Sequence, residues 1–184
     1  ITNDAIQVFG GYGYTKDQGI EQLFRDNRIT PIYEGTNSVQ AIDLVYRKIL
    51  NNKIFEKYIA QLSNEVKDFA KDNKLSLFAD KFFKYLELLN NFTLWLGEKN
   101  KSSKDDVSAA CNDYLKVLGY IALAHSWLKI LKVSHSKLKE NKTFYEDKIN
   151  TAKYYFDKIL PRVQSHYLSA ITGSDTMMKS NFNW

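Results

Sequence analysis

The amino-acid sequence predicts an all-α protein. Apolar residues recur at intervals of three and four positions along most of the chain, which is the period of an amphipathic helix. Two prolines and eight glycines among 184 residues leave little of the turn punctuation that an all-β fold requires. With 44% hydrophobic and 26% charged residues, the chain has the composition of a globular protein with a sizeable core.

Residues 1–52 are predicted to form three short helices separated by sharp breaks. The first helix ends at Phe9, because the pair of glycines that follows favours the left-handed backbone that often closes a helix. The second covers roughly residues 18–29, and Pro31 ends it because the residue before a proline is driven out of helical geometry.

The third helix is predicted to begin at Thr36 or Asn37, since both residue types are good N-caps. Gln40 lies three residues after Asn37, an approximate capping-box arrangement. We expect this helix to continue to about Leu50, where a pair of asparagines closes it. Residues 32–35 are left as a short connector between the second and third helices.

From residue 53 onward, four long apolar stripes alternate with short polar loops, and they indicate an up-and-down four-helix bundle over residues 53–172. Pro161 falls inside the last stripe, and we expect it to kink that helix by removing a backbone hydrogen bond. Residues 173–184 have no clear period and are predicted to form an irregular tail. The stripes comprise Phe55, Ile59, Leu62, Val66 and Phe69; Phe78, Phe82, Tyr85, Leu89, Phe92 and Leu96; Val107, Cys111, Tyr114, Leu118, Ile121 and Leu128; and Ile149, Ala152, Phe156, Leu160, Val163 and Tyr167.

The net charge of +5 is unevenly distributed, because residues 1–52 hold five Lys or Arg against six Asp or Glu. The basic remainder can attract nucleic acid, acidic lipid or a phosphorylated ligand. Its lysines alternate with acids along helical faces, however, which is the pattern of a solvated surface, and we expect no nucleic-acid partner. No stretch approaches the roughly 20 apolar residues of a membrane-spanning helix, so no integral membrane segment is expected.

Cysteine and histidine usage excludes several kinds of site. Cys111 is the single cysteine, so no intrachain disulfide can form, which is compatible with a reducing compartment such as the cytoplasm. His125, His135 and His166 have no metal-ligand spacing and no adjacent nucleophile motif, and no metal site is predicted. His125 falls beside the apolar stripe of its helix, where we expect a core histidine with one satisfied nitrogen.

Two segments near the start of the chain are candidates for chemistry. The run from Gly10 to Tyr14 is glycine-rich, but it lacks the G-x-G-x-x-G spacing and follows a helix, so by itself it indicates a tight turn. Glu34 stands in the connector beside Ile32 and Tyr33. A carboxylate in such a place is a candidate general base, although a single glutamate in a loop is more often a solvated charge.

Together these segments resemble the C-terminal signature of acyl-CoA dehydrogenases, and three linked motifs are far more specific than any one of them. The motifs are AIQVFGGYGY at residues 5–14, LFRD with RI at 23–29 and IYEGTN at 32–37. Residues 40–48, 113–119 and 148–161 resemble a large subfamily with an extra helical C-terminal domain, of the methylmercaptopropionyl-CoA dehydrogenase kind. The resemblance covers essentially the whole chain and implies that residues 1–52 are the end of the dehydrogenase helical domain.

The resemblance implies an FAD-dependent enzyme that oxidises an acyl-CoA thioester to its 2-enoyl-CoA. Glu34 matches the residue that removes the proton α to the thioester carbonyl, and its backbone N–H matches a donor to the thioester oxygen. Tyr33 and Gly35 match positions that line the substrate, and Thr36 matches a position at the flavin. By the same resemblance, an electron-transfer flavoprotein is the expected electron acceptor and the cytoplasm, or the mitochondrial matrix of a eukaryote, the expected compartment.

Gln7, Gly10 and Gly11 match positions that contact the FAD of a neighbouring subunit, which implies a homodimer with shared sites. Glycine at such positions lets the backbone approach a cofactor closely. Ser38 stands where some relatives carry a larger polar residue, and its contact with the flavin is not implied.

The family's N-terminal helical domain and middle β-domain, which hold most of the FAD and CoA contacts, are not part of this sequence, so we predict that the chain alone is inactive. One alternative is a non-catalytic helical assembly or interaction domain of dehydrogenase ancestry. Another is a basic helical module for a membrane surface or nucleic acid, whose binding is strongly salt-dependent. The interleaved acids argue against the second alternative, and Glu34 in its motif separates the enzyme from both.

Overall fold

The structure is a computed structural model and describes residues 1–51 and 54–179. Every regular element in these two ranges is a helix, so the predicted all-α fold is confirmed. The chain divides into two compact units, Ile1–Gln40 and Ala41–Trp184. The boundary that the sequence predicts at residues 52 and 53 lies outside the described residues and stays a prediction.

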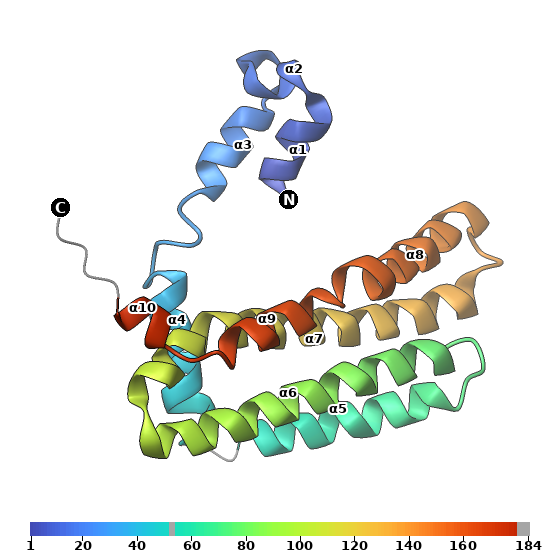
Figure 1. Cartoon of the computed structure of the whole chain (residues 1–184). Helices are drawn as coiled ribbons and strands as arrows, with labels where there is room; N and C mark the ends of the chain where they lie inside the picture. The colour runs from blue at the N-terminus through green and yellow to red at the C-terminus, as the bar shows by residue number, and fades with distance from the viewer. Residues whose placement is uncertain (52–53, 180–184) are drawn as a thin grey trace. The chain divides into compact units, whose positions relative to one another are not determined.

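The first unit contains three helices that pack against one another, α1 (Thr2–Phe9), α2 (Gly11–Tyr14) and α3 (Ile20–Asn27) (Figure 1). Gly13 is the only buried residue among residues 1–40, all of which the structure describes. A Cβ atom at this position would lie 2.6 Å from the carbonyl oxygen of Ile6. The backbones of α1 and α2 therefore touch at Gly13, and only glycine fits there.

The first predicted helix ends at Phe9 as expected, and Gly10 caps it with a φ of 60°. The second prediction, one helix over residues 18–29, is wrong at both ends. A 3₁₀ turn, η1 (Lys16–Gln18), comes first, and the left-handed Gly19 separates it from α3. Helix α3 ends at Asn27, whose carbonyl accepts hydrogen bonds from the N–H and the hydroxyl of Thr30 in a tight turn.

The third predicted helix has the expected extent but changes its winding. It begins as α4 (Asn37–Asp43) and continues as the π-helical segment η2 (Leu44–Ile49), with the N–H of Leu50 bonded to the carbonyl of Val45 at 2.9 Å. The hydroxyl of Tyr46 donates to the carbonyl of Lys104 at 3.0 Å. This bond joins η2 to the start of α7 within the second unit.

The second unit is the predicted up-and-down bundle. Its long helices are α5 (Ile54–Ala70), α6 (Ser76–Ser102) and α7 (Lys104–Lys137), and its fourth column consists of α8 (Lys142–Tyr154) and α9 (Arg162–Ala170) (Figure 1). Helix α7 packs against each of the other three columns and forms the centre of the bundle.

Pro161 does more than kink the fourth column. Helix α8 passes into a π-helical segment, η3 (Tyr155–Ile159), the chain turns at Leu160 and Pro161, and α9 then begins. The expected kink is therefore a break, because proline has no N–H to continue the helix but is well placed just before the start of a new one. The expected irregular tail is also partly wrong, since α10 (Asp175–Met178) is helical, whereas residues 180–184 lie outside the described residues.

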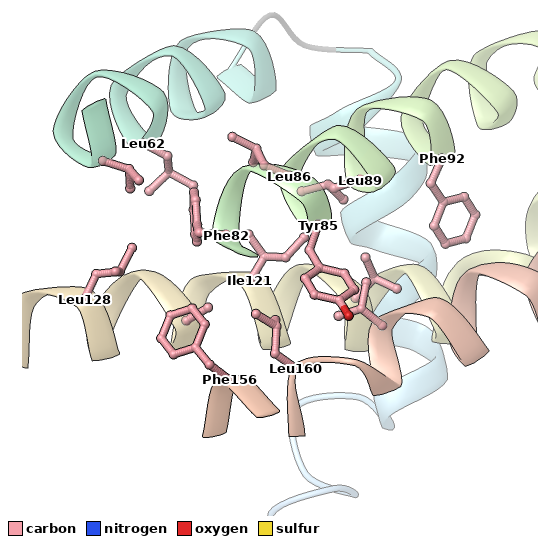
Figure 2. Close-up of a cluster of buried hydrophobic side chains, with 14 of the residues drawn as sticks. Leu62, Phe82, Tyr85, Leu86, Leu89, Phe92, Ile121, Leu128, Phe156 and Leu160 are labelled. Atoms are coloured by element: carbon pink, nitrogen blue, oxygen red, sulfur yellow. The ribbon is translucent and has the colours of Figure 1, made fainter. Parts of the chain in front are cut away.

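The bundle core is built from the predicted stripes of all four columns (Figure 2). The rings of Phe92 and Tyr114 pack edge-on with their centroids 5.1 Å apart, and the centroids of Phe78 and Phe156 lie 5.2 Å apart. Each fully buried side chain of this size contributes about 1.5–3 kcal/mol of transfer free energy. Three stripe residues, Ile59, Leu118 and Tyr167, are half-buried instead of buried.

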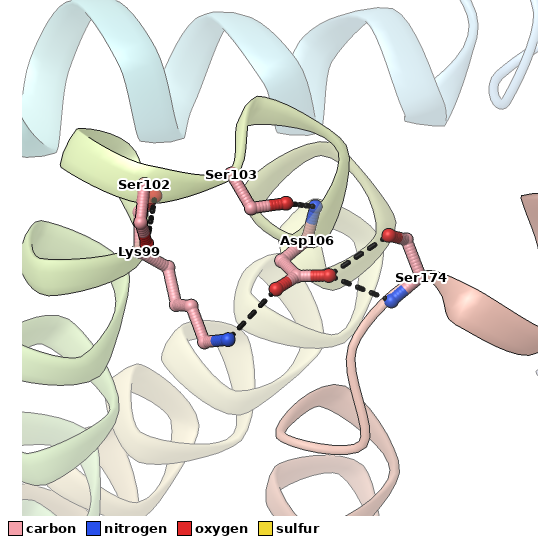
Figure 3. A network of polar contacts seen from close by, with 5 residues as sticks. All are labelled: Lys99, Ser102, Ser103, Asp106 and Ser174. Atoms are coloured by element: carbon pink, nitrogen blue, oxygen red, sulfur yellow. Dashed lines mark hydrogen bonds and ion pairs between the residues drawn. The ribbon is translucent and has the colours of Figure 1, made fainter.

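A polar network closes one end of the bundle (Figure 3). The carboxylate of Asp106, at the start of α7, accepts a hydrogen bond from the ammonium of Lys99 at 2.8 Å and two from Ser174. The hydroxyl of Ser103 caps the same helix by accepting from the N–H of Asp106 at 3.2 Å. The bond from Lys99, followed by those from Ser174, holds the pKa of Asp106 well below its usual range.

Candidate active site

The connector between α3 and α4 folds into a compact turn around Glu34. The N–H of Tyr33 donates to the carbonyl of Ile29 at 3.0 Å, and the N–H of Asn37 donates to the carbonyl of Pro31 at 3.3 Å. These two bonds hold the chain on either side of Glu34, so the backbone of the turn is fixed although it belongs to no regular element.

Glu34 has a backbone φ of 56° and is the only non-glycine residue with a positive φ in the described ranges. The left-handed conformation costs an L-residue with a Cβ atom roughly 1–2 kcal/mol, and a long charged side chain gains nothing from it locally. Such strain persists only where the surroundings impose it, and it concentrates at functional sites. The candidate base is thus the one non-glycine residue of the described backbone that adopts this conformation.

The side chain of Gln40 bonds to the strained residue. Its amide nitrogen donates a hydrogen bond to the carbonyl of Glu34 at 2.5 Å. A net hydrogen bond contributes about 0.5–1.5 kcal/mol, which is the same size as the strain at Glu34. The expected capping-box role of Gln40 at the helix start is not found, because its side chain bonds to the turn instead.

Gly35 completes the turn with a φ of 98°. A Cβ atom there would lie 3.2 Å from Cγ1 of Val39 and 3.4 Å from the amide nitrogen of Gln40. A larger residue would therefore be strained in its backbone and would also press on the group that holds Glu34.

The surroundings of Glu34 are open within this chain. Glu34 and Thr36 are exposed, and the side chains of Ile32 and Tyr33 are 46% and 53% exposed, so they do not enclose the carboxylate. The backbone N–H of Glu34 makes no hydrogen bond to any part of the chain that the structure describes. Both a carboxylate and a free N–H donor are therefore presented at the same residue.

A second group of predicted residues meets at the junction of α1 and α2. The N–H of Gly10 donates to the carbonyl of Gln7 at 3.1 Å, and Gly10 has a positive φ. Cβ atoms placed at Gly10 and Gly11 would meet nothing within 4 Å, so the backbone there is open to a ligand. The glycine that packing does require is Gly13, which the sequence analysis did not single out because only the contact with Ile6 reveals it.

The structure brings the predicted residues together as two groups. Gln7, Gly10 and Gly11 form one group, and the residues from Tyr33 to Thr36 form the other, with Gln40 added to it. We find no hydrogen bond between the two groups in the described part of the chain.

The histidines take structural roles in the bundle. Nε2 of His125 lies 2.9 Å from Oε2 of Glu65, so one nitrogen is satisfied as expected, although His125 is half-buried and not a core residue. Burial, followed by the charge of Lys129, lowers the pKa of His125. His166 pairs in the same way with Asp113 at 2.8 Å. No group of three or more His, Cys, Asp or Glu side chains within the described ranges is arranged to hold a metal ion.

Two family patterns match the chain. The pattern described as "Acyl-CoA dehydrogenase, C-terminal domain" matches residues 1–50, and the one described as "Acetyl-CoA dehydrogenase C-terminal like" matches residues 62–181. The chain belongs to the acyl-CoA dehydrogenase family. All the predicted site residues of this chain lie within the first of the two matched ranges.

Curated relatives agree with this assignment. The chain is 59% identical over 49 residues to cyclohexane-1-carbonyl-CoA dehydrogenase of Syntrophus aciditrophicus, covering 27% of this chain and 12% of that protein. It is 29% identical over 173 residues to butyryl-CoA dehydrogenase of Syntrophomonas wolfei, covering 88% of this chain and 28% of that protein. It is 49% identical over 52 residues to 3-methylmercaptopropionyl-CoA dehydrogenase of Ruegeria pomeroyi, covering 28% and 9%. The chain thus spans less than a third of the length of these relatives.

A membrane-spanning helix needs about 20 predominantly apolar residues. In the described part of this chain, no helix combines the length and the apolar character needed to cross a bilayer.

Proposed function

We propose that this chain is the C-terminal part of an FAD-dependent acyl-CoA dehydrogenase, and that Glu34 is the base that removes the α-proton of the substrate. The observation that carries the proposal is the strained turn at Glu34, with its φ of 56°, inside a segment that matches the family. Structural glutamates on a protein surface have no need of such a backbone, whereas a base must point its carboxylate at one atom.

Two groups on Glu34 serve the two halves of the proton transfer. Its carboxylate takes the proton from the carbon α to the thioester carbonyl. The electron pair of the broken C–H bond develops negative charge on the carbonyl oxygen and then forms the Cα–Cβ double bond as a hydride leaves the β-carbon. The unbonded N–H of Glu34 donates a hydrogen bond to that oxygen, where negative charge develops. When bound, FAD supplies the acceptor for the hydride that leaves the β-carbon. Tyr33 and Gly35 line the acyl thioester on either side of the base.

The residues proposed for the cofactor fit such a group. Gly10 and Gly11 present open backbone, and the exposed amide side chain of Gln7 can both donate and accept hydrogen bonds. Thr36 is exposed next to the base turn. In our proposal Gln7, Gly10 and Gly11 contact the FAD of a second copy, so the complete enzyme is a homodimer, and an electron-transfer flavoprotein accepts its electrons.

The chain alone is proposed to be inactive, because other parts of the enzyme are needed to enclose the substrate and the cofactor at the two groups of site residues. Large apolar residues of the first unit support this view, since Val8, Tyr12 and Tyr14 are 85%, 70% and 86% exposed. Surfaces of this kind normally pack against other protein.

The experiment uses the longer enzyme that contains this chain, loaded with FAD and titrated anaerobically with acyl-CoA thioesters of short, long, branched and sulfur-containing acyl groups. The proposal expects at least one class to bleach the flavin. Flavin that binds but is bleached by no class of thioester contradicts the proposal and favours the non-catalytic assembly domain. The chain by itself, incubated with FAD and the best substrate, is expected to show no turnover, and measurable turnover would overturn its inactivity.

A further inference from the structure

The side-chain bond from Gln40 to Glu34 spans six residues and crosses the whole turn. Gln40 is itself fixed, because its backbone N–H donates to the carbonyl of Thr36 at 3.0 Å in the first turn of α4. Its amide nitrogen then reaches back to the carbonyl of Glu34 at 2.5 Å. The strained residue is therefore tied to the rigid helix that follows it.

The bond acts on the peptide group whose rotation decides where Glu34 points. If Glu34 relaxed to the right-handed region, its carbonyl would rotate away and its carboxylate and N–H would leave their present directions. The amide of Gln40 donates to this carbonyl in the observed conformation. Gly35 leaves the room that this donor needs, since a Cβ atom there would come within 3.4 Å of the amide nitrogen.

We infer that Gln40 is a positioning residue of the proposed dehydrogenase, because it holds Glu34 in the left-handed conformation that aims the base and its N–H at the substrate. The inference rests on the proposed function for its catalytic consequence, but the effect of Gln40 on the backbone of Glu34 does not depend on that function. Gln40 touches neither proton nor hydride, and it acts only through Glu34.

The test compares Gln40→Met, which keeps the volume of the side chain but removes its donor, with Gln164→Met as the matched control. Gln164 is an exposed residue of α9 whose side chain makes no hydrogen bond in the described structure. In the FAD-loaded enzyme, Gln40→Met is expected to slow substrate-dependent flavin reduction about 10- to 100-fold, because a misplaced catalytic group costs factors of this size. The substrate concentration at half-maximal rate and the flavin content are expected to change little.

A second readout follows the backbone itself. Two NMR quantities of residue 34 report the left-handed conformation in isotopically labelled protein. They are the three-bond scalar coupling between its amide and α-protons and its Cα chemical shift. Gln40→Met is expected to move both toward right-handed values, and Gln164→Met is expected to leave them unchanged. In a Glu34→Gly background the same Gln40→Met change is expected to move residue 34 much less, because glycine adopts a positive φ without strain.

The positioning role of Gln40 and the proposed function of Glu34 can fail independently of each other. If Glu34→Gln abolishes flavin reduction but Gln40→Met reduces flavin at the wild-type rate, the positioning role is overturned and the proposed function stands. If Glu34→Gln still reduces flavin, the proposed function fails, and the spectra of residue 34 then decide on Gln40 by themselves. Unchanged spectra in Gln40→Met overturn the inference in either case. The variant Gln40→Glu replaces the donor by an acceptor. It is therefore expected to move the spectra of residue 34 in the same direction as Gln40→Met.

Discussion

The backbone N–H and the hydroxyl of Ser174 both donate to Oδ1 of Asp106, at 2.9 Å and 2.8 Å (Figure 3). Lys99 binds the other carboxylate oxygen, so one buried side chain joins the end of α6, the start of α7 and the C-terminal segment. Residues separated by 68 positions in sequence are thereby held together at one end of the bundle.

Replacing Asp106 by alanine leaves the donors of Lys99 and Ser174 without their acceptor. We expect a loss of about 2–3 kcal/mol in the free energy of unfolding, since unsatisfied buried donors are costly. Urea denaturation of the chain measures this loss. Asp147→Ala is the control, because its exposed carboxylate makes no hydrogen bond or ion pair within the described residues. Equal midpoints for the two variants would contradict the structural role of Asp106.

The free energy of unfolding is expected to depend on pH in the acid range because of Asp106. The pKa of Asp106 is lower in the folded chain than its ordinary value, so the unfolded chain binds the proton first as pH falls. Its contribution is therefore complete above about pH 4 and is lost progressively below it. In Asp106→Ala this part of the acid dependence is expected to disappear. A pair of urea curves at pH 3 and pH 6 for each protein checks the sign.

Gly173 precedes Ser174 and has a φ of 80°, and a Cβ atom there would lie 2.9 Å from Oδ1 of Asp106. We expect Gly173→Ala to lose at least about 1–2 kcal/mol of stability from backbone strain alone. Gly97→Ala is the matched control, because Gly97 lies inside α6 with open space around it. That change is expected to gain about 0.5–1 kcal/mol. The same sign for both variants would be inconsistent with this geometry.

His125 predicts a second pH effect at milder pH. Burial lowers its pKa in the folded chain, so protonation below about pH 6.5 favours the unfolded state and the melting temperature falls with pH. Glu65, whose pKa the bonds from Gln61 and then Lys129 hold at about 2, stays ionised in this range and continues to bind the ring. The variant His125→Gln keeps a donor for Glu65 and does not titrate. It should show a smaller difference in melting temperature between pH 5.5 and pH 7.5 than the wild type.

Alanine substitutions of the two glycines Gly11 and Gly13 at the α1–α2 junction are expected to differ in their effects on stability and flavin content. Gly13→Ala forces a Cβ atom against the backbone of Ile6, so the longer enzyme should lose stability and flavin together. Gly11→Ala meets open space and should leave the melting temperature of the flavin-free protein unchanged. If Gly11 contacts FAD as proposed, that variant should still retain less flavin. Full retention of flavin in Gly11→Ala would contradict the cofactor contact.

The bundle could be predicted from the sequence because its cause is repeated many times. Each stripe places an apolar residue every three or four positions, so a few misplaced members such as Ile59 do not change the buried face. The breaks are harder to predict because each depends on one residue. Gly19 begins a new helix where periodicity continues, and the π-helical turns at residues 44–49 and 155–159 leave no mark on the apolar pattern.

The candidate site was predictable as a set of residues but not as a geometry. The motif around Glu34 identifies the residue, whereas its positive φ occurs in a turn that is closed by Asn37 and in which Gln40 bonds to the carbonyl of Glu34. The residue types alone do not predict that Glu34 has a positive φ. The role of Gly13 was missed for a similar reason, since a tertiary contact with Ile6 decides it.

The central claim, that Glu34 is the base, is tested most directly by rapid anaerobic mixing of substrate with the FAD-loaded enzyme and its Glu34→Gln variant. The control is Glu87→Gln, an exposed residue of α6. We expect the variant at residue 34 to bind flavin and substrate but to reduce its flavin about 100- to 10,000-fold more slowly, since loss of a positioned base costs two to four orders of magnitude. Flavin reduction at the wild-type rate in Glu34→Gln would show that another residue removes the proton.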